Sequence, residues 1–203
     1  MRVTVGILLL LAATAAACVP ARTSAPKPMS LTEVIDAQIS AKGGLRWAKD
    51  RPLTPTDFKG TAPTSTGQEG AHTEYTIISG ARCVGRTLEY RVTLAMLPSQ
   101  SWFVPELRRS PSDSAKTLRH EQTHFDLSEV YARKIRRKFA ESYDVCSQSE
   151  AALQAISDTL VKDEAGEQIR YDEETNHGRT VALQSDWDKK VAGWLDALGK
   201  YGQ

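Results

Sequence analysis

The residues of this chain whose types and spacing most plainly suit chemistry are two histidines and a glutamate, His120, Glu121 and His124, in the sequence His-Glu-Gln-Thr-His. Residues four apart on a helix lie one turn apart on the same face, so both imidazoles can bind one metal ion. Glu121 then lies beside the ion, where a base is needed to take a proton from a metal-bound water. The motif predicts a catalytic zinc site. The alternative interpretation is a pair of surface histidines on an amphipathic helix.

A catalytic zinc usually has three protein ligands and one open position for water. The residues one turn further along the helix are not competent ligands, so the third ligand must come from elsewhere in the chain. We expect it to be His177, because the polar segment Asn176-His177-Gly178 has the backbone freedom to reach the ion. His72, which precedes a predicted strand, and Asp172 are the alternatives.

A long helix is expected to carry the motif, from residue 111 to about 142. Ser110 suits an N-cap, Pro111 suits the first helical position, and Asp113 adds an acidic residue to the first turn. No Gly or Pro interrupts the stretch that follows. A basic cluster near its C-terminal end is interpreted as a solvated face that matches the helix dipole: Arg133, Lys134, Arg136, Arg137 and Lys138.

Two strands and three further helices are expected around the long helix. Residues 73–78 are rich in β-branched and aromatic side chains, and residues 88–96 alternate strictly between apolar and other side chains. The two form a plausible antiparallel pair, with 88–96 as the edge strand beside which an extended substrate would pair. The other helices are expected at 31–41, 151–161 and 180–198, with a short polar segment, 171–178, between the last two. The prediction is an α+β fold, a small antiparallel sheet packed on helices.

The first residues have the features of an export signal. Arg2 precedes an uncharged run rich in Leu and Ala, which is too short to span a bilayer comfortably and ends in small residues at 15–17. We expect residues 1–17 to be a signal peptide, and Cys18 to be lipid-modified as in bacterial lipoproteins, with 18–30 as a Pro-rich tether. The alternative is a soluble periplasmic or secreted protein. Removing Cys18 from an odd count of three cysteines leaves Cys83 and Cys146 as a predicted disulfide.

Charge and length exclude some classes of function. Loss of Arg2 with the signal would change 26 basic against 25 acidic residues to 25 against 25, so no basic field would recruit nucleic acid. The remaining residues, 31–203, suit one domain. Contact with a membrane is expected through the lipid anchor alone, at a periplasmic or outer-membrane location. The sequence leaves the oligomeric state open.

Residues spread along most of this domain carry a family resemblance. They include Trp47, Asp57-Phe58-Lys59-Gly60, Ala71-His72-Thr73, Ser101-Trp102, Arg119-His120-Glu121-Gln122-Thr123-His124-Phe125-Asp126, and Tyr171-Asp172-Glu173-Glu174-Thr175-Asn176-His177-Gly178. The chain resembles a bacterial family of uncharacterised, predicted secreted zinc-dependent proteases. The resemblance implies a zincin-like fold in which His120, His124 and His177 bind zinc and Glu121 is catalytic.

These observations lead to the hypothesis of a zinc metallopeptidase of the cell envelope, acting on a peptide or protein. Tyr171, six residues before His177, is a candidate catalytic donor to an oxyanion, or else a packing residue. Two other functions are alternative hypotheses. The first is a zinc amidase acting on cell-wall or small-molecule amides, and the second is a non-catalytic lipoprotein that uses zinc to hold its fold or a partner.

Overall fold

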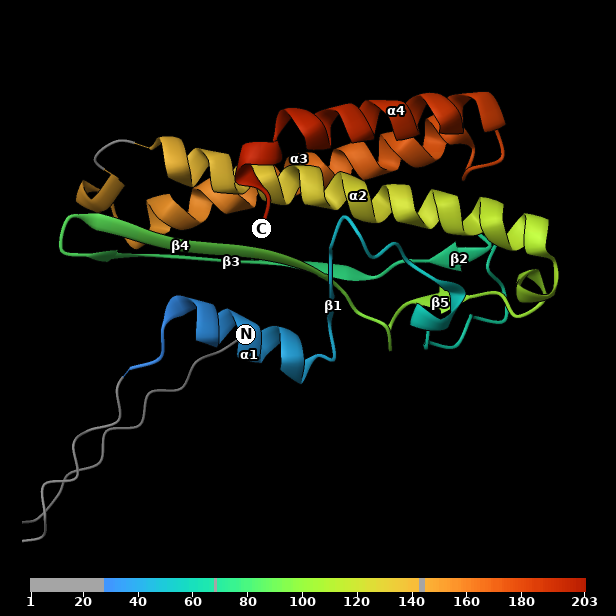
Figure 1. Ribbon diagram of the computed structural model, residues 1–203, viewed down its shortest axis with the longest axis horizontal. Coiled ribbons are helices and arrows are strands. Elements are labelled where there is room, and N and C mark those ends of the chain that lie inside the picture. The colour runs from blue at the N-terminus through green and yellow to red at the C-terminus, as the bar shows by residue number, and fades with distance from the viewer. Residues whose placement is uncertain (1–27, 68, 143–144) are drawn as a thin grey trace, which may run out of the picture.

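The long helix expected from the sequence is present as α2 (Pro111–Glu141), and it lies between a β-hairpin and two further helices (Figure 1). The computed structural model describes residues 28–67, 69–142 and 145–203. Helices α3 (Glu150–Thr175) and α4 (Val181–Ala197) pack on the side of α2 away from the hairpin, and α1 (Leu31–Ala41) covers the opposite face of the hairpin. The α+β fold, with small antiparallel sheets packed on helices, is confirmed.

The hairpin consists of β3 (Tyr75–Val84) and β4 (Thr87–Met96), paired antiparallel along their whole length. Gly85 has a φ of 62° in the two-residue turn between them, a left-handed conformation that favours glycine. The short strand β1 (Leu45–Arg46) pairs with the other side of β4. The prediction that 88–96 forms an edge strand is therefore wrong for its last residues, because β1 pairs with residues 95 and 96 and makes β4 the central strand of this sheet.

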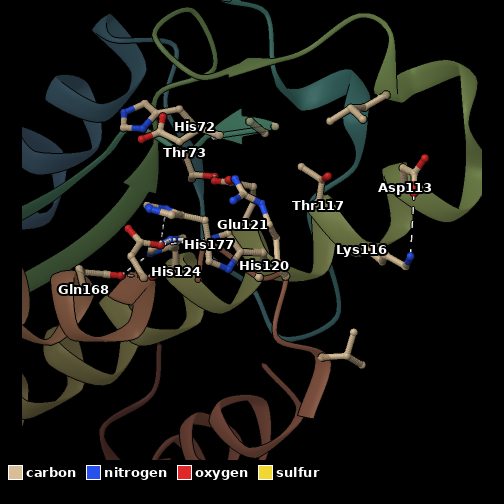
Figure 2. Close-up of a pocket in the computed structure, with 18 of the residues that line it drawn as sticks. His72, Thr73, Asp113, Lys116, Thr117, His120, Glu121, His124, Gln168 and His177 are labelled. Atoms are coloured by element: carbon tan, nitrogen blue, oxygen red, sulfur yellow. Dashed lines mark hydrogen bonds and ion pairs between the residues drawn. The ribbon is translucent and has the colours of Figure 1, made fainter. Parts of the chain in front are cut away.

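A second sheet, of two short strands, lies at the motif-bearing end of α2. It consists of β2 (Ala71–His72) and β5 (Trp102–Phe103), paired antiparallel. Its residues Ala71 and Phe103 are buried in the core between α2 and the sheets. The sheet thus brings the segment around His72 over the helix that carries the two motif histidines (Figures 1 and 2).

Burial on nearly all sides holds α2 in place. One face packs against β4, where Val92, Leu94 and Met96 contact Phe125 and Ile135 in the main apolar core. The other face packs on α3 and α4 in a second cluster: Leu127, Val130, Tyr131, Tyr171, Trp187, Val191 and Leu198. A third cluster joins α1 to the outer face of β4 and explains why residues 92–96 of that strand are buried on both faces: Ile35, Ile39 and Ala95.

Helix α3 is much longer than the predicted helix at 151–161. It continues through Tyr171 and Asp172 and ends at Thr175, so the polar segment expected at 171–178 is mostly helical. A Cβ added at Gly166 would meet nothing within 4 Å, and this single glycine does not end the helix. Polar side chains beyond the predicted end of the helix, such as Glu164 and Gln168, are buried against α2. These contacts with α2 continue past the predicted end of the helix, so Tyr171 and Asp172 are held on a regular helix.

The basic cluster on α2 is partly interior, which corrects the interpretation of a solvated face. Arg133 and Arg136 are only 7% and 5% exposed, and both pair with the buried carboxylate of Glu129. Arg136 also donates to the carbonyl oxygens of Val92 and Tyr201. At this level α2 is enclosed by β4 and the C-terminal residues, so both guanidinium groups need partners within the protein.

The predicted disulfide between Cys83 and Cys146 is present, and it joins the end of β3 to the short 3-10 helix Val145–Ser147 that precedes α3. Within the described residues, no helix combines the length and the apolar character needed to cross a bilayer. The predicted signal peptide and Cys18 lie outside the described residues.

Replacing both Cys83 and Cys146 by Ser should lower the free energy of unfolding by about 4 kcal/mol, because the bond closes a loop with a sequence separation of 63. Urea unfolding followed by tryptophan fluorescence measures this. Reductant should shift the wild type toward the variant and leave the variant unchanged. A variant that unfolds at the wild-type urea concentration would contradict the prediction.

Candidate metal centre

Three ligand atoms from two helices lie close together, and Figure 2 shows the two that belong to His120 and His124. His120 Nε2 and His124 Nε2 lie 3.1 Å apart, and Oδ1 of Asp172 on α3 lies 3.0 Å from each of them. Two ligands at 2.0–2.1 Å from a tetrahedral zinc ion are about 3.3 Å apart. The triangle of donor atoms is therefore close to the size that such an ion requires.

His177 lies at the edge of this triangle. Its Nδ1 is 3.5 Å from Asp172 Oδ1, and His120, Asp172 and His177 each offer a ligand atom within 4.8 Å of the others. The chain leaves α3 through left-handed conformations at Asn176, His177 and Gly178. A Cβ at Gly178 would lie 3.0 Å from His120 Cβ, so glycine allows this turn to approach the helix that carries the motif histidines closely. We call His120, His124, Asp172 and His177 the metal cluster.

Hydrogen bonds on the far side of each imidazole fit metal binding. His120 Nδ1 lies 3.1 Å from Gln184 Oε1, and His124 Nδ1 lies 2.6 Å from Gln168 Oε1. An amide oxygen only accepts, so both Nδ1 atoms carry a proton, and Nε2 is the nitrogen whose lone pair an ion in the cluster would take. Two lone pairs and a carboxylate oxygen at mutual distances of about 3 Å repel one another unless a cation lies among them.

The electrostatics of the cluster favour positive charge. Burial disfavours the charged form of His124, but the hydrogen bond that protonated His124 donates to Asp172 and the negative charges of Glu121 and Asp172 outweigh it and raise the pKa of His124. Burial likewise opposes ionisation of Asp172, and the hydrogen bonds with His120 and His124 overcome it, so the pKa of Asp172 lies well below its usual range. The carboxylate is thus ionised and the site attracts a proton or a metal ion.

Glu121 is buried beside the cluster and accepts a short hydrogen bond. Its Oε2 accepts a hydrogen bond of 2.6 Å from the Thr73 hydroxyl, which follows β2. Both residues line the same cavity as the metal cluster (Figure 2). The carboxylate is therefore in a position to act on a molecule bound at the metal.

The cavity has a volume of about 570 Å³ and opens to solvent. Its floor is the motif-bearing part of α2, and its opposite wall is β2 with the residues on either side of it. Asp113 and Lys116 lie farther along α2, and the turn after α3 adds His177 and Arg179. This is an open cleft that passes over the metal cluster, rather than an enclosed chamber.

Two other residues considered from the sequence lie outside the triangle. His72 lines the cleft but bonds to Glu74 at 3.3 Å and stacks on Trp102, so it is no rival for the ligand position in this arrangement. Tyr171 is fully buried, stacks on His120 with ring centroids 4.8 Å apart, and donates to the His120 carbonyl oxygen and Gln184 Oε1. Its hydroxyl thus faces α2 and α4, which fits the packing interpretation and offers no support for an oxyanion donor.

The rest of the motif anchors the site to the scaffold. Gln122 accepts from the backbone N–H of Leu53 and donates to Asp126, which also accepts from the indole N–H of Trp47. Sequence reasoning noted these residues but gave them no role. Gln168 and Gln184 were missed as partners of the histidines, and no local pattern distinguishes them from surface glutamines.

Comparison with known proteins gives a family but no function. No curated protein and no solved structure matches the chain. A family model described as bacterial protein of unknown function (DUF922) matches residues 54–178, more than half of the chain. The matched residues include the whole metal cluster, Glu121 and Thr73, whereas α4 with Gln184 lies beyond them. This chain belongs to the DUF922 family of bacterial proteins of unknown function.

Proposed function

We propose that this protein is a zinc-dependent peptidase that acts outside the cytoplasm. The observation that carries the proposal is the buried Glu121 carboxylate, placed in one open cleft with a cluster of donor atoms of the size that zinc requires. A purely structural zinc site is usually closed by four protein ligands and needs no base beside it. The resemblance to predicted secreted zinc-dependent proteases points to the same activity.

Each residue has a definite task in this proposal. Zinc, when bound, supplies Lewis acidity that polarises a carbonyl group and lowers the pKa of water. The Thr73 hydroxyl fixes the orientation of the Glu121 carboxylate, which accepts a proton from the attacking water and passes it to the departing amine. The cleft leaves room for an extended chain to pass on either side of the bond that is cleaved.

The geometry favours Asp172 over His177 as the third ligand. Asp172 Oδ1 completes a triangle with edges of 3.0 to 3.1 Å, whereas His177 approaches through Nδ1 at 3.5 Å from Asp172. His177 then lies beside the open position and faces the bound substrate. The sequence instead favours His177 as the third ligand, with Asp172 as an alternative.

Several features support a location outside the cytoplasm. The disulfide between Cys83 and Cys146 is typical of exported proteins, because cytoplasmic thiols are kept reduced. The expected signal peptide and the lipid anchor at Cys18 would place the domain in the periplasm or on the outer membrane. Envelope proteins and peptides are the corresponding substrates.

Zinc titration of ligand variants tests the metal site. The wild type should bind one zinc ion per chain. Asp172→Asn should raise the dissociation constant for zinc by more than about 100-fold, which is more than the loss of a residue that only contacts a ligand usually causes. His177→Ala should weaken it less, and His72→Ala should match the wild type. Competition with a chromophoric chelator measures all four proteins. If His177→Ala loses more affinity than Asp172→Asn, His177 is the third ligand.

Glu121→Gln should retain zinc within a few-fold and lower turnover by about 10²- to 10⁴-fold, because it removes the base and leaves the shape unchanged. Unfolded protein and peptidoglycan fragments are the two substrates to compare. Glu89→Gln, at an exposed carboxylate paired with Arg82 on the hairpin, is the matched control and should turn over like the wild type.

Three results would contradict the peptidase. Full turnover by Glu121→Gln removes the proposed base. Cleavage of peptidoglycan fragments without cleavage of protein indicates an amidase. No turnover of either substrate by the zinc-loaded wild type, with unfolding on removal of the metal, indicates a zinc-stabilised lipoprotein.

A further inference from the structure

Behind the metal cluster, each of the two motif histidines is backed by a glutamine and each glutamine by a carboxylate. On α4, Gln184 lies between His120 and Asp188; on α3, Gln168 lies between His124 and Glu164. In both cases the glutamine and the carboxylate are four residues apart on one helix and therefore on the same face. The two sets come from different helices and approach the cluster separately.

The α4 set has one consistent arrangement of protons. Asp188 only accepts hydrogen bonds, so the Gln184 amide must direct Nε2 toward it, at 2.6 Å from Oδ1. Gln184 Oε1 then faces His120 Nδ1 at 3.1 Å and also accepts from the Tyr171 hydroxyl at 2.9 Å. An oxygen that faces Nδ1 requires a proton on Nδ1, so Nε2 is the unprotonated nitrogen of the neutral imidazole that binds a metal.

The α3 set repeats this logic with a more buried carboxylate. Glu164, 4% exposed, accepts from Gln168 Nε2 at 2.7 Å, from Tyr75 at 2.6 Å and from Ser128 at 2.9 Å. Gln168 Nε2 also donates to the His124 carbonyl oxygen at 3.0 Å. These bonds fix the amide so that Oε1 meets His124 Nδ1 at 2.6 Å.

We propose that Gln168 and Gln184 are positioning residues that hold His124 and His120 in the tautomer protonated at Nδ1, so that both Nε2 atoms are ready to bind metal. The inference rests on the proposed zinc site and adds residues that the motif does not contain. The carboxylates act through the glutamines: each fixes the orientation of an amide, and the amide fixes an imidazole.

A neutral amide next to each imidazole has an electrostatic advantage over a carboxylate. The cluster already contains the Asp172 carboxylate, and Glu121 adds a second negative charge next to it. A carboxylate in direct contact with each histidine would place two more negative charges directly against the buried imidazoles. The amides transmit the orientation while Glu164 and Asp188 remain one residue further from the metal.

Nuclear magnetic resonance of the histidine side chains in the zinc-loaded full chain tests the proposal directly. Long-range proton–nitrogen correlations should assign a proton to Nδ1 and the metal to Nε2 in both His120 and His124. This measurement needs no variant and no substrate, so it gives a result even if the protein hydrolyses neither test substrate. Zinc bound through Nδ1 of either histidine would overturn the proposal.

Gln168→Met keeps much of the side-chain volume and removes the acceptor. It should weaken zinc binding by about 10- to 100-fold and abolish the protected Nδ1 proton signal of His124, while the signal of His120 stays unchanged. Gln184→Met should have the reverse pattern. The reciprocal exchange Glu164→Gln with Gln168→Glu again places an acceptor against Nδ1, and it should recover most of the affinity lost in Gln168→Met.

The matched control is Gln154→Met, because Gln154 donates to Asp158 four residues on along the same helix but is exposed and far from the metal cluster. It should bind zinc like the wild type. Wild-type affinity in Gln168→Met, with the His124 Nδ1 proton still protected, would overturn the positioning role. Loss of zinc in the glutamine variants together with an inactive wild type would support this inference and contradict the peptidase.

Discussion

The mutual repulsion of three metal-ligand atoms held about 3 Å apart is the constraint on which the rest of the structure depends. His120 Nε2, His124 Nε2 and Asp172 Oδ1 direct their lone pairs at one point. Without a cation this arrangement is unfavourable, and side chains free to rotate would move apart. The surrounding protein prevents that motion. Tyr171 packs against both imidazoles, and the glutamines of α3 and α4 hold their outer nitrogens.

The helix that carries the histidines must itself be immobile, and two features distant from the cluster contribute to this. Glu129 with Arg133 and Arg136 links α2 to β4 and to the C-terminal residues through buried charge-assisted bonds. The disulfide joins the hairpin to the segment that leads into α3. Because α3 supplies Asp172 and Gln168, this link and the bonds of Glu164 and Gln168 to α2 fix the third corner of the triangle. Stability and metal geometry are thus served by the same contacts.

The sequence predicted the structure best where a rule about neighbouring residues or residue counts decides the outcome by itself. The His-Glu-x-x-His spacing, the proline and serine at the start of α2, and the alternation in β4 each led to a correct element, and the cysteine count led to the disulfide. Long-range packing decided the features that were missed. Whether Arg133 is solvated depends on the path of the C-terminal residues, where it donates to the carbonyl oxygen of Leu195. Residues 171–175 are part of a helix that is packed on α2, where the Tyr171 hydroxyl donates to the carbonyl oxygen of His120. The identity of β2 as the cleft wall likewise follows from its pairing with β5, which no local pattern reveals.

In the site, too, some residues are recognisable from a local rule and others only from long-range packing. His120, Glu121 and His124 are recognisable because helical geometry alone places them together. Asp172 ranked below His177 in the sequence because a flexible loop was expected there, and a continuous helix instead places Asp172 nearest to both histidines. The glutamines behind the histidines come from α3 and α4, and only the packing of three helices makes them partners.

The most direct test of the central claim is an anomalous difference map at the zinc absorption edge, from crystals of the zinc-loaded protein. The account predicts one peak at about 2.0–2.2 Å from His120 Nε2, His124 Nε2 and Asp172 Oδ1, beside the Glu121 carboxylate. A map with no peak in the cleft, or a peak bound by other residues, would contradict it.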